Sequence, residues 1–294
     1  MKRIRLCLYG SLTLFLCTFI VGTFFDYEIN HELFHNLDTF GLVISVLGKI
    51  PGYLVFNYVG GGLFAYALRK NDYKLWLRFL FFFFSLACLL TTAIIEGLEF
   101  FGLNGFYWVT QRGWGLFISF PLMIGLSYLG YLFFRHSENK NLWILLVIIM
   151  VALAGALLGG ITLIKEIFHR PRYRSVVNDA LDFYPWYERC ADYKEQMKLL
   201  ELSSEEFKSF PSGHSGTSIG FALAALFLPF VDKKYQKIQL PLFFSGLAVA
   251  ILVMFSRLYV GAHYLSDVSM GAIVSIVFMC IALEVVKNTK KFTI

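Results

Sequence analysis

Charged residues are scarce in this chain of 294 residues, where Asp, Glu, Lys and Arg together make up 16% of the sequence. Ordinary soluble domains contain about 25%, so this chain has too little polar surface to cover a soluble core of its size. Hydrophobic residues make up 57% of it, and 32 residues are phenylalanine. A disordered chain is also excluded, because such chains are highly charged and contain few aromatic residues. The composition therefore predicts an integral membrane protein of several spans.

The sequence also lacks the cysteine spacings of a metal site. It contains no CxxC pair, and four of its five cysteines, Cys7, Cys17, Cys88 and Cys280, lie in apolar runs. Only Cys190 lies in a polar stretch, where we expect an inert loop thiol. The sequence therefore predicts neither a structural zinc site nor a disulfide framework.

Eight apolar runs of about 20 residues predict an all-α fold with eight transmembrane helices. The second run is the least regular, because Lys49 and Pro51 separate it from the moderately apolar stretch Phe40–Leu47. That stretch is interpreted as an interfacial segment, or alternatively as the first part of one long kinked helix. The eight runs are Leu6–Phe25, Gly52–Leu68, Leu75–Ile95, Trp114–Phe134, Leu142–Ile164, Ser215–Val231, Leu240–Phe255 and Val268–Val286.

The first run follows Lys2, Arg3 and Arg5, as either a signal anchor or a cleaved signal peptide would. A signal anchor is favoured, because the run is longer than the apolar part of a typical signal peptide. In addition, no small-x-small cleavage site follows Phe25. We therefore expect this segment to form the first transmembrane helix.

Loops rich in Lys and Arg predict the orientation, because these residues accumulate on the cytoplasmic side of a membrane. With the N-terminus inside, the two short outer loops hold only Lys49 and Arg112, and the first of them carries acidic residues, including Asp26. Both termini are therefore predicted to be cytoplasmic. The net charge of +6 reflects the loops, so no nucleic-acid partner is expected. The inner segments hold Lys2, Arg3, Arg5, Arg69, Lys70, Lys74, Arg78, Arg135, Lys140, Lys233, Lys234, Lys237, Lys287, Lys290 and Lys291.

No linker divides the chain, but its two parts differ in content. Residues 1–140 hold four spans without a recognisable motif, and residues 141–294 hold the other four. The second part includes one outer insert, residues 174–210, which is interpreted as a lid over a site or as a simple bridge between spans. Within the insert, Ser203 and Glu206 have the spacing of a capping box. Its aromatic residues cluster at Phe183, Tyr184, Trp186 and Tyr187.

Polar and charged groups gather at the predicted outer ends of the last four spans. Among them, His263 and Asp267 are four residues apart, so both side chains share one face if the segment is helical. A carboxylate that accepts the Nδ1–H of an imidazole leaves Nε2 as an oriented, basic nitrogen. The pair therefore predicts a nucleophile or a general base.

A second group of residues has the chemistry of an anion site. His214 begins a span directly after proline and glycine, where free backbone N–H groups bind anions. Gly213 leaves room for phosphate oxygens to approach closely, and Ser212 adds a hydroxyl donor. Three further residues at this face would supply positive charges that suit a phosphate, and two of them are arginines capable of bidentate contact. They are Lys165, Arg172 and Arg257.

Together these segments resemble the three motifs of the type 2 phosphatidic acid phosphatase superfamily, and the resemblance covers about Leu142–Val286. In the first motif, Arg172 has the family's spacing from Lys165, whereas Arg170 precedes a proline as the family's arginine usually does. We favour Arg172. The family core has three spans before its second motif, whereas five are predicted here. The matching segments are Lys165-x6-Arg172, Pro211-Ser212-Gly213-His214 and Ser256-Arg257-x5-His263-x3-Asp267.

The resemblance implies a metal-independent phosphatase without a cofactor, which acts on a lipid phosphate at the membrane surface. It implies that His263 attacks phosphorus and forms a phosphohistidine, that Asp267 orients His263, and that His214 protonates the leaving oxygen and then activates water. The remaining motif residues would hold the phosphate: Lys165, Arg172, Ser212, Gly213 and Arg257.

The predicted topology places this site on the extracytoplasmic face of the plasma membrane, in the cell envelope. Undecaprenyl pyrophosphate is therefore the first substrate expected, and phosphatidic acid or phosphatidylglycerol phosphate is the alternative. Phosphate transfer to another acceptor would use the same phosphohistidine. A catalytically silent lipid binder is a further alternative, although such proteins replace catalytic residues that this chain retains. Membrane lipids are expected neighbours, and the pattern makes no prediction of oligomeric state.

Overall fold

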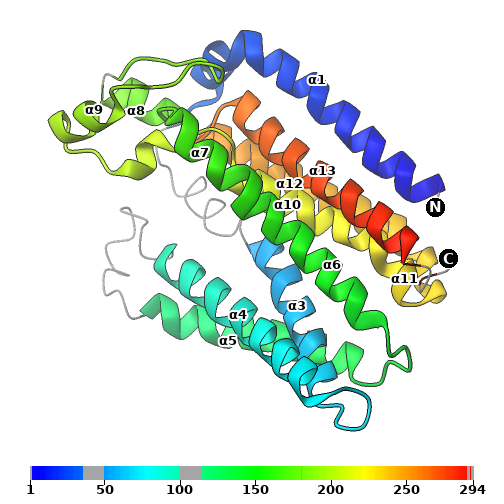
Figure 1. The fold of residues 1–294 in the computed structure, drawn as a ribbon. Helices are drawn as coiled ribbons and strands as arrows, with labels where there is room; N and C mark the ends of the chain where they lie inside the picture. The colour runs from blue at the N-terminus through cyan, green and yellow to red at the C-terminus, as the bar shows by residue number, and fades with distance from the viewer. Residues whose placement is uncertain (1, 36–49, 100–113, 180, 290–291, 293–294) are drawn as a thin grey trace.

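The computed structural model describes residues 2–35, 50–99, 114–179, 181–289 and 292 of the chain. In this part of the chain all regular structure is helical (Figure 1). Seven of the described helices are long and apolar enough to cross a membrane. The predicted all-α class and the multi-pass membrane character are therefore confirmed. The stretch Phe40–Leu47 lies outside the described residues.

Four helices precede the second half of the chain: α1 (Lys2–Leu33), α3 (Ile50–Ala67), α4 (Leu75–Glu99) and α5 (Trp114–Phe134). Next, α6 (Leu142–Ala154) continues through a π-helical stretch (Gly155–Thr162) into α7 (Leu163–Phe168). The outer insert contains α8 (Tyr173–Asn178), α9 (Tyr193–Leu199) and a 3-10 turn (Ser204–Phe207). After it, α10 (Gly213–Ala224) leads through a 3-10 turn (Ala225–Phe227) into α11 (Leu228–Val231). A 3-10 turn (Lys233–Lys237), α12 (Gln239–Tyr259) and α13 (Leu265–Asn288) complete the described helices.

Helix α3 corresponds to the least regular of the eight predicted spans, and it is not among the seven candidate spans. Most of its residues are buried, so other parts of the protein cover most of α3. Buried Asn57 bonds with Thr92 of α4 and Ser127 of α5. A Cβ on Gly61 would stand 1.7 Å from the backbone oxygen of Ser127, so α3 and α5 approach too closely for a side chain. Glycines and polar residues of this kind are typical of the places where transmembrane helices pack closely against each other.

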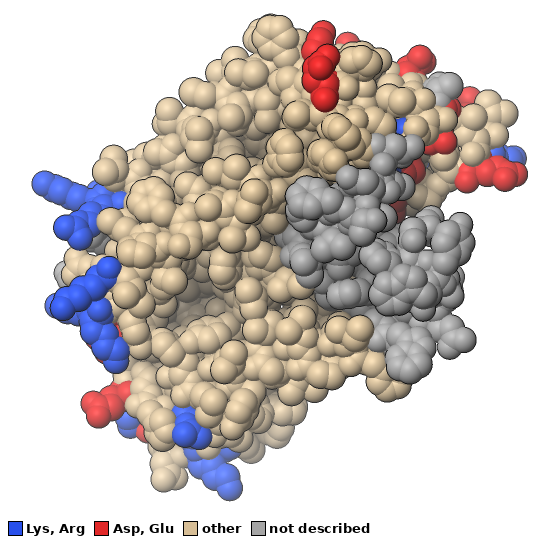
Figure 2. All heavy atoms as spheres, turned by 180° about the vertical axis from the view of Figure 1, so that it is seen from behind, with Lys and Arg blue, Asp and Glu red and all other residues tan. Residues whose placement is uncertain are grey.

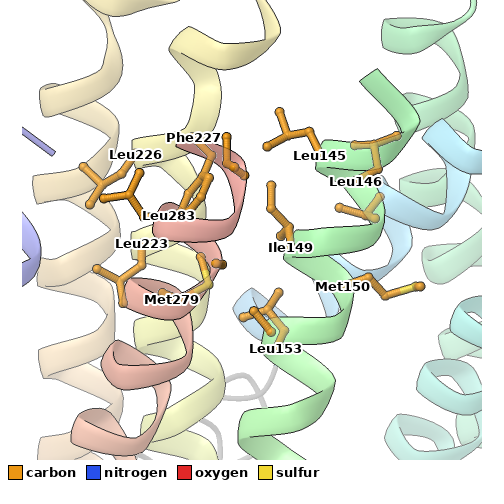
Figure 3. Close-up of a cluster of buried hydrophobic side chains, with 14 of the residues drawn as sticks. Leu145, Leu146, Ile149, Met150, Leu153, Leu223, Leu226, Phe227, Met279 and Leu283 are labelled. Atoms are coloured by element: carbon orange, nitrogen blue, oxygen red, sulfur yellow. The ribbon is translucent and has the colours of Figure 1, made fainter. Parts of the chain in front are cut away.

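The apolar core of the second half lies between α6, α10 and α13. Figure 3 shows side chains of α6, such as Leu145 and Ile149, opposite residues of the other two helices. Leu223 of α10 and Met279 of α13 are almost completely buried in this contact. Such close packing holds the helices rigidly enough to fix residues at their ends.

The segments predicted to be cytoplasmic meet at one end of the molecule. Arg5 of α1 forms an ion pair of 3.0 Å with Glu284 of α13. Lys140, before α6, pairs with Asp72, before α4. Figure 1 shows both termini at this end and α8 and α9 at the opposite end. On the face seen in Figure 2, a wide uncharged band separates the Lys and Arg side chains of this end from the acidic residues of the other.

Candidate active site

The three sequence motifs converge at the end of the molecule that also carries the outer insert. The first lies where α7 ends, the second begins α10, and the third joins α12 to α13. Ser212 is the N-cap of α10, and its backbone N–H donates to the carbonyl oxygen of Asp267 over 2.9 Å. A Cβ on Gly213 would meet no atom of the described residues within 4 Å, so none of these residues fills the space beside the start of α10. His214 follows directly and is half-buried.

His263 lies in the connection between α12 and α13, and its side chain is buried, with 2% of the residue exposed. Its Nδ1 lies 2.6 Å from the backbone oxygen of Ser209. A carbonyl oxygen only accepts hydrogen bonds, so Nδ1 carries the proton. Nε2 is then the unprotonated nitrogen of the neutral imidazole, with the electron pair that a nucleophile requires.

The structure does not contain the expected direct hydrogen bond between the side chains of His263 and Asp267. The nearest carboxylate oxygen of Asp267 is 3.8 Å from Nδ1, which is longer than a hydrogen bond. Ser209 connects them: its backbone oxygen accepts from His263, and its hydroxyl donates to Asp267 over 2.5 Å. Sequence reasoning missed Ser209, because a serine beside the second motif carries no signal that it will be buried against the third.

Arg170 is completely buried beneath these residues. One end of its guanidinium donates to Asp267 over 2.6 Å and to Ser266 over 2.9 Å. The other end donates to Asp26 of α1 over 3.0 Å, and Nε donates to the backbone oxygen of Tyr184 in the insert. All three nitrogens of this guanidinium are thus engaged by the protein. Arg170 therefore holds protein groups of the site in place, whereas Arg172 is the arginine with the family's spacing from Lys165.

Lys165, Arg172 and Arg257, called the motif cations below, lie close enough to His263 to act on it electrostatically. Burial lowers the pKa of the His263 imidazole well below its usual value, and the charges of all three motif cations lower it further, while Asp267 acts in the opposite direction. His263 is therefore neutral at pH 7. An anion of phosphate size beside Nε2 would meet converging positive charges. Within the described residues, no group of three His, Cys, Asp or Glu side chains is arranged to hold a metal ion.

The outer insert returns to the motif cations near its end. Glu205 lies 3.6 Å from Arg172, and Lys165 donates a hydrogen bond to the backbone oxygen of Lys208. The capping box expected from Ser203 and Glu206 is absent, since Ser203 makes no side-chain cap. Glu206 instead binds Arg174 and Ser175. Burial alone would raise the pKa of Glu206, but Arg174 and Arg172 outweigh it and bring the pKa to about 2.

The aromatic residues of the insert pack against α1 and the site. Trp186 donates to the hydroxyl of Thr23 over 3.0 Å and stacks on Phe210, just before the second motif. Phe183 makes an edge contact with Tyr264, the residue after His263. This part of the insert is therefore a packed layer rather than a freely solvated loop.

Two residues of α1 that the sequence patterns do not single out reach the site. Asp26, predicted to lie in the first outer loop, is instead inside α1 and only 4% exposed. One of its carboxylate oxygens accepts from the backbone N–H of Ser266 over 2.9 Å. Asn30 donates to the backbone oxygen of His263 over 3.0 Å. Asp26 and Asn30 follow the kink of α1 at Phe25, and their four-residue spacing places both side chains on one helix face, a signal that apolar runs do not reveal.

The comparisons with known proteins agree with these motifs. The family model described as PAP2 superfamily matches residues 141–291, slightly more than half of the chain, and this range includes all three motifs. The comparisons with curated proteins and with solved structures gave no match. Membership of this superfamily implies phosphatase or phosphotransferase chemistry on lipid-like phosphates. The chain has several helices that could cross a membrane, and it brings these three motifs together at one end. It belongs to the PAP2 superfamily.

Proposed function

We propose that the chain is an integral membrane lipid phosphatase that hydrolyses a lipid phosphate or pyrophosphate through a phosphohistidine. The observation that carries this proposal is the state of His263. Its Nδ1 proton is held by the Ser209 carbonyl, which leaves Nε2 as the nitrogen with the lone pair, and the charges of the three motif cations act on the imidazole. A neutral, oriented imidazole beside converging positive charges is what nucleophilic attack on a phosphate needs.

In the first step, His263 Nε2 forms a bond to phosphorus, and the bond between phosphorus and the leaving oxygen breaks. His214 gives that oxygen a proton and thereby becomes neutral. In the second step, His214 takes a proton from water, whose oxygen attacks phosphorus and breaks the P–N bond. Phosphate leaves, and both histidines return to their starting states.

Charge on the transferring phosphoryl group is stabilised by the motif cations and by the start of α10. Lys165, Arg172 and Arg257 would face its oxygens, and the backbone N–H groups after Ser212 add the positive end of a helix. None of the described residues fills the space beside Gly213, which supports this placement, because a phosphate oxygen can approach the backbone there. We propose that these groups replace a metal ion in the reaction.

The proposed membrane orientation directs the choice of substrate. The site lies at the opposite end of the molecule from the Lys and Arg residues of the predicted inner segments, which supports cytoplasmic termini and an extracytoplasmic site. Lipid pyrophosphates released by cell-wall synthesis are exposed on that face. Undecaprenyl pyrophosphate is therefore the first substrate to test, and phosphatidic acid and phosphatidylglycerol phosphate are the alternatives.

The first prediction concerns phosphate release by the purified protein from these three lipids. Release should continue in excess EDTA, and His263→Ala should lose at least about 1,000-fold of the rate, as removal of a covalent nucleophile does. His136→Ala, an exposed histidine at the other end of the molecule, is the matched control and should retain full activity. Activity that EDTA abolishes and Mg²⁺ restores would contradict the mechanism. Release only in the presence of a second acceptor would indicate phosphate transfer instead.

The second prediction concerns pH. Because the pKa of His263 is lowered, the imidazole stays neutral below the ordinary histidine pKa of about 6.5. The rate should therefore fall on acidification only below pH about 6.5, when His263 becomes protonated and loses its lone pair. The measurement is kcat/KM against pH, corrected for the known ionisation of the substrate, because this ratio reports groups of the free enzyme. An acid limb that begins above pH 6.5 would contradict a neutral, buried nucleophile.

The third prediction concerns Glu205, whose carboxylate lies beside Arg172 and is largely exposed. Glu205→Gln removes a negative charge that competes with the substrate phosphate for Arg172. We expect KM to fall by about 1.5- to 5-fold, the range of an exposed ion pair, with kcat unchanged within about twofold. Glu195→Gln, an exposed acidic residue of α9 in the same insert, is the matched control. A higher KM for Glu205→Gln would mean that this carboxylate helps to hold Arg172 for the substrate.

A further inference from the structure

We infer that α1 supplies positioning residues for the nucleophile, namely Asp26 and Asn30, so that the first helix is part of the catalytic apparatus. This inference rests on the proposed phosphatase function. Helix α1 lies outside residues 141–291, the range that the family model matches. Neither residue touches the place proposed for the phosphate, and both act through the backbone and side chains that hold His263.

Asp26 joins α1 to the start of α13 and to Arg170. Its Oδ1 accepts from the backbone N–H of Ser266, and its Oδ2 accepts from the Ser266 hydroxyl and from Arg170. Ser266 is the second residue of α13, where backbone N–H groups have no partner within their own helix. A carboxylate there satisfies such a donor and interacts favourably with the helix dipole. Asp26 therefore anchors the start of the helix whose third residue is Asp267.

The same carboxylate determines how Arg170 is held. Arg170 is fully buried, and its guanidinium lies between Asp26 on one side and Asp267 on the other. Removing one partner of a buried charge leaves the rest of the group poorly compensated and free to shift. Since Asp267 reaches His263 through Ser209, a shift of Arg170 would be transmitted to the imidazole.

Asn30 acts on the nucleophile from the next turn of α1. Its Nδ2 donates to the backbone oxygen of His263, and the whole residue is buried. The side chain therefore fixes the backbone of the nucleophile itself, while the carbonyl of Ser209 fixes the ring. Together they set both the position and the direction of Nε2.

Gly22 shows how closely α1 is fitted to this region. A Cβ on Gly22 would stand 2.5 Å from the backbone nitrogen of Ser266 and 2.9 Å from Oδ1 of Asp26. Only glycine permits this approach. Thr18 lies one turn before Gly22 in α1 and makes a hydroxyl contact of 2.8 Å with Ser269 of α13. The contact between α1 and the start of α13 is thus continuous rather than a single bond.

The first test compares Asp26→Asn with Glu28→Gln, which removes an exposed carboxylate from the same end of the same helix. Each full-length protein is assayed for phosphate release, and binding of inorganic phosphate counts the sites that remain folded. We expect kcat per phosphate-binding site to fall about 10- to 100-fold in Asp26→Asn, as for a small misplacement of a reacting group. The number of sites and their affinity for phosphate should remain within about twofold of wild type. Glu28→Gln should match wild type throughout.

The second test changes the contact without removing a polar group. Gly22→Ala should show the same fall in kcat per phosphate-binding site, because its Cβ separates α1 from Ser266. Gly10→Ala is its matched control on α1, where a Cβ would meet no atom of the described residues within 4 Å.

Asn30→Asp keeps the shape of the side chain but removes the donor to His263, and it should also lower kcat more than phosphate affinity.

The outcomes separate this inference from the function on which it rests. If wild type releases no phosphate from any lipid, the proposed function fails and the inference fails with it. If wild type is active and Asp26→Asn equals it per site, only the inference fails. A loss of activity that simply follows a loss of phosphate-binding sites would also overturn it, because Asp26 would then serve folding alone.

Discussion

The geometry of the candidate active site depends on one buried arginine. Arg170 is inaccessible to solvent and donates to two carboxylates, Asp267 of α13 and Asp26 of α1. A buried guanidinium is tolerated only when its charge and its hydrogen bonds are satisfied, so these elements have a single compatible arrangement. Asp267 then holds Ser209, and the backbone oxygen of Ser209 holds the ring of His263. Through this chain of contacts, Arg170 governs the position of the His263 imidazole without touching it.

This arrangement divides the positive charges of the first motif between two tasks. Arg170 forms hydrogen bonds within the protein, with partners in α1, α13 and the insert. Arg172, two residues later, faces the insert's Glu205 and influences the His263 imidazole together with Lys165. The intervening Pro171 removes one backbone donor and restricts the chain between them. Arg172, which has the family's spacing from Lys165, is not part of this buried network.

The sequence predicts the elements of this protein better than the contacts between them. Apolar runs reveal long lipid-facing helices directly, whereas α3, which is enclosed by protein, departs from the pattern through its glycines and Asn57. Motif spacing identified His263 and Asp267, but not that Ser209 connects them. An acidic residue after an apolar run is typical of an outer boundary, so the sequence pattern predicts a loop position for Asp26. These contacts join residues as much as 240 positions apart and arise only when helices pack.

The most direct test of this division of roles is an experimental structure with orthovanadate, which resembles a phosphoryl group in transfer. We predict that vanadium is bonded to Nε2 of His263 and that its oxygens contact the motif cations. Arg170 should remain between Asp26 and Asp267 without touching the vanadate. Vanadate bound to Arg170, or bound away from His263, would contradict the account.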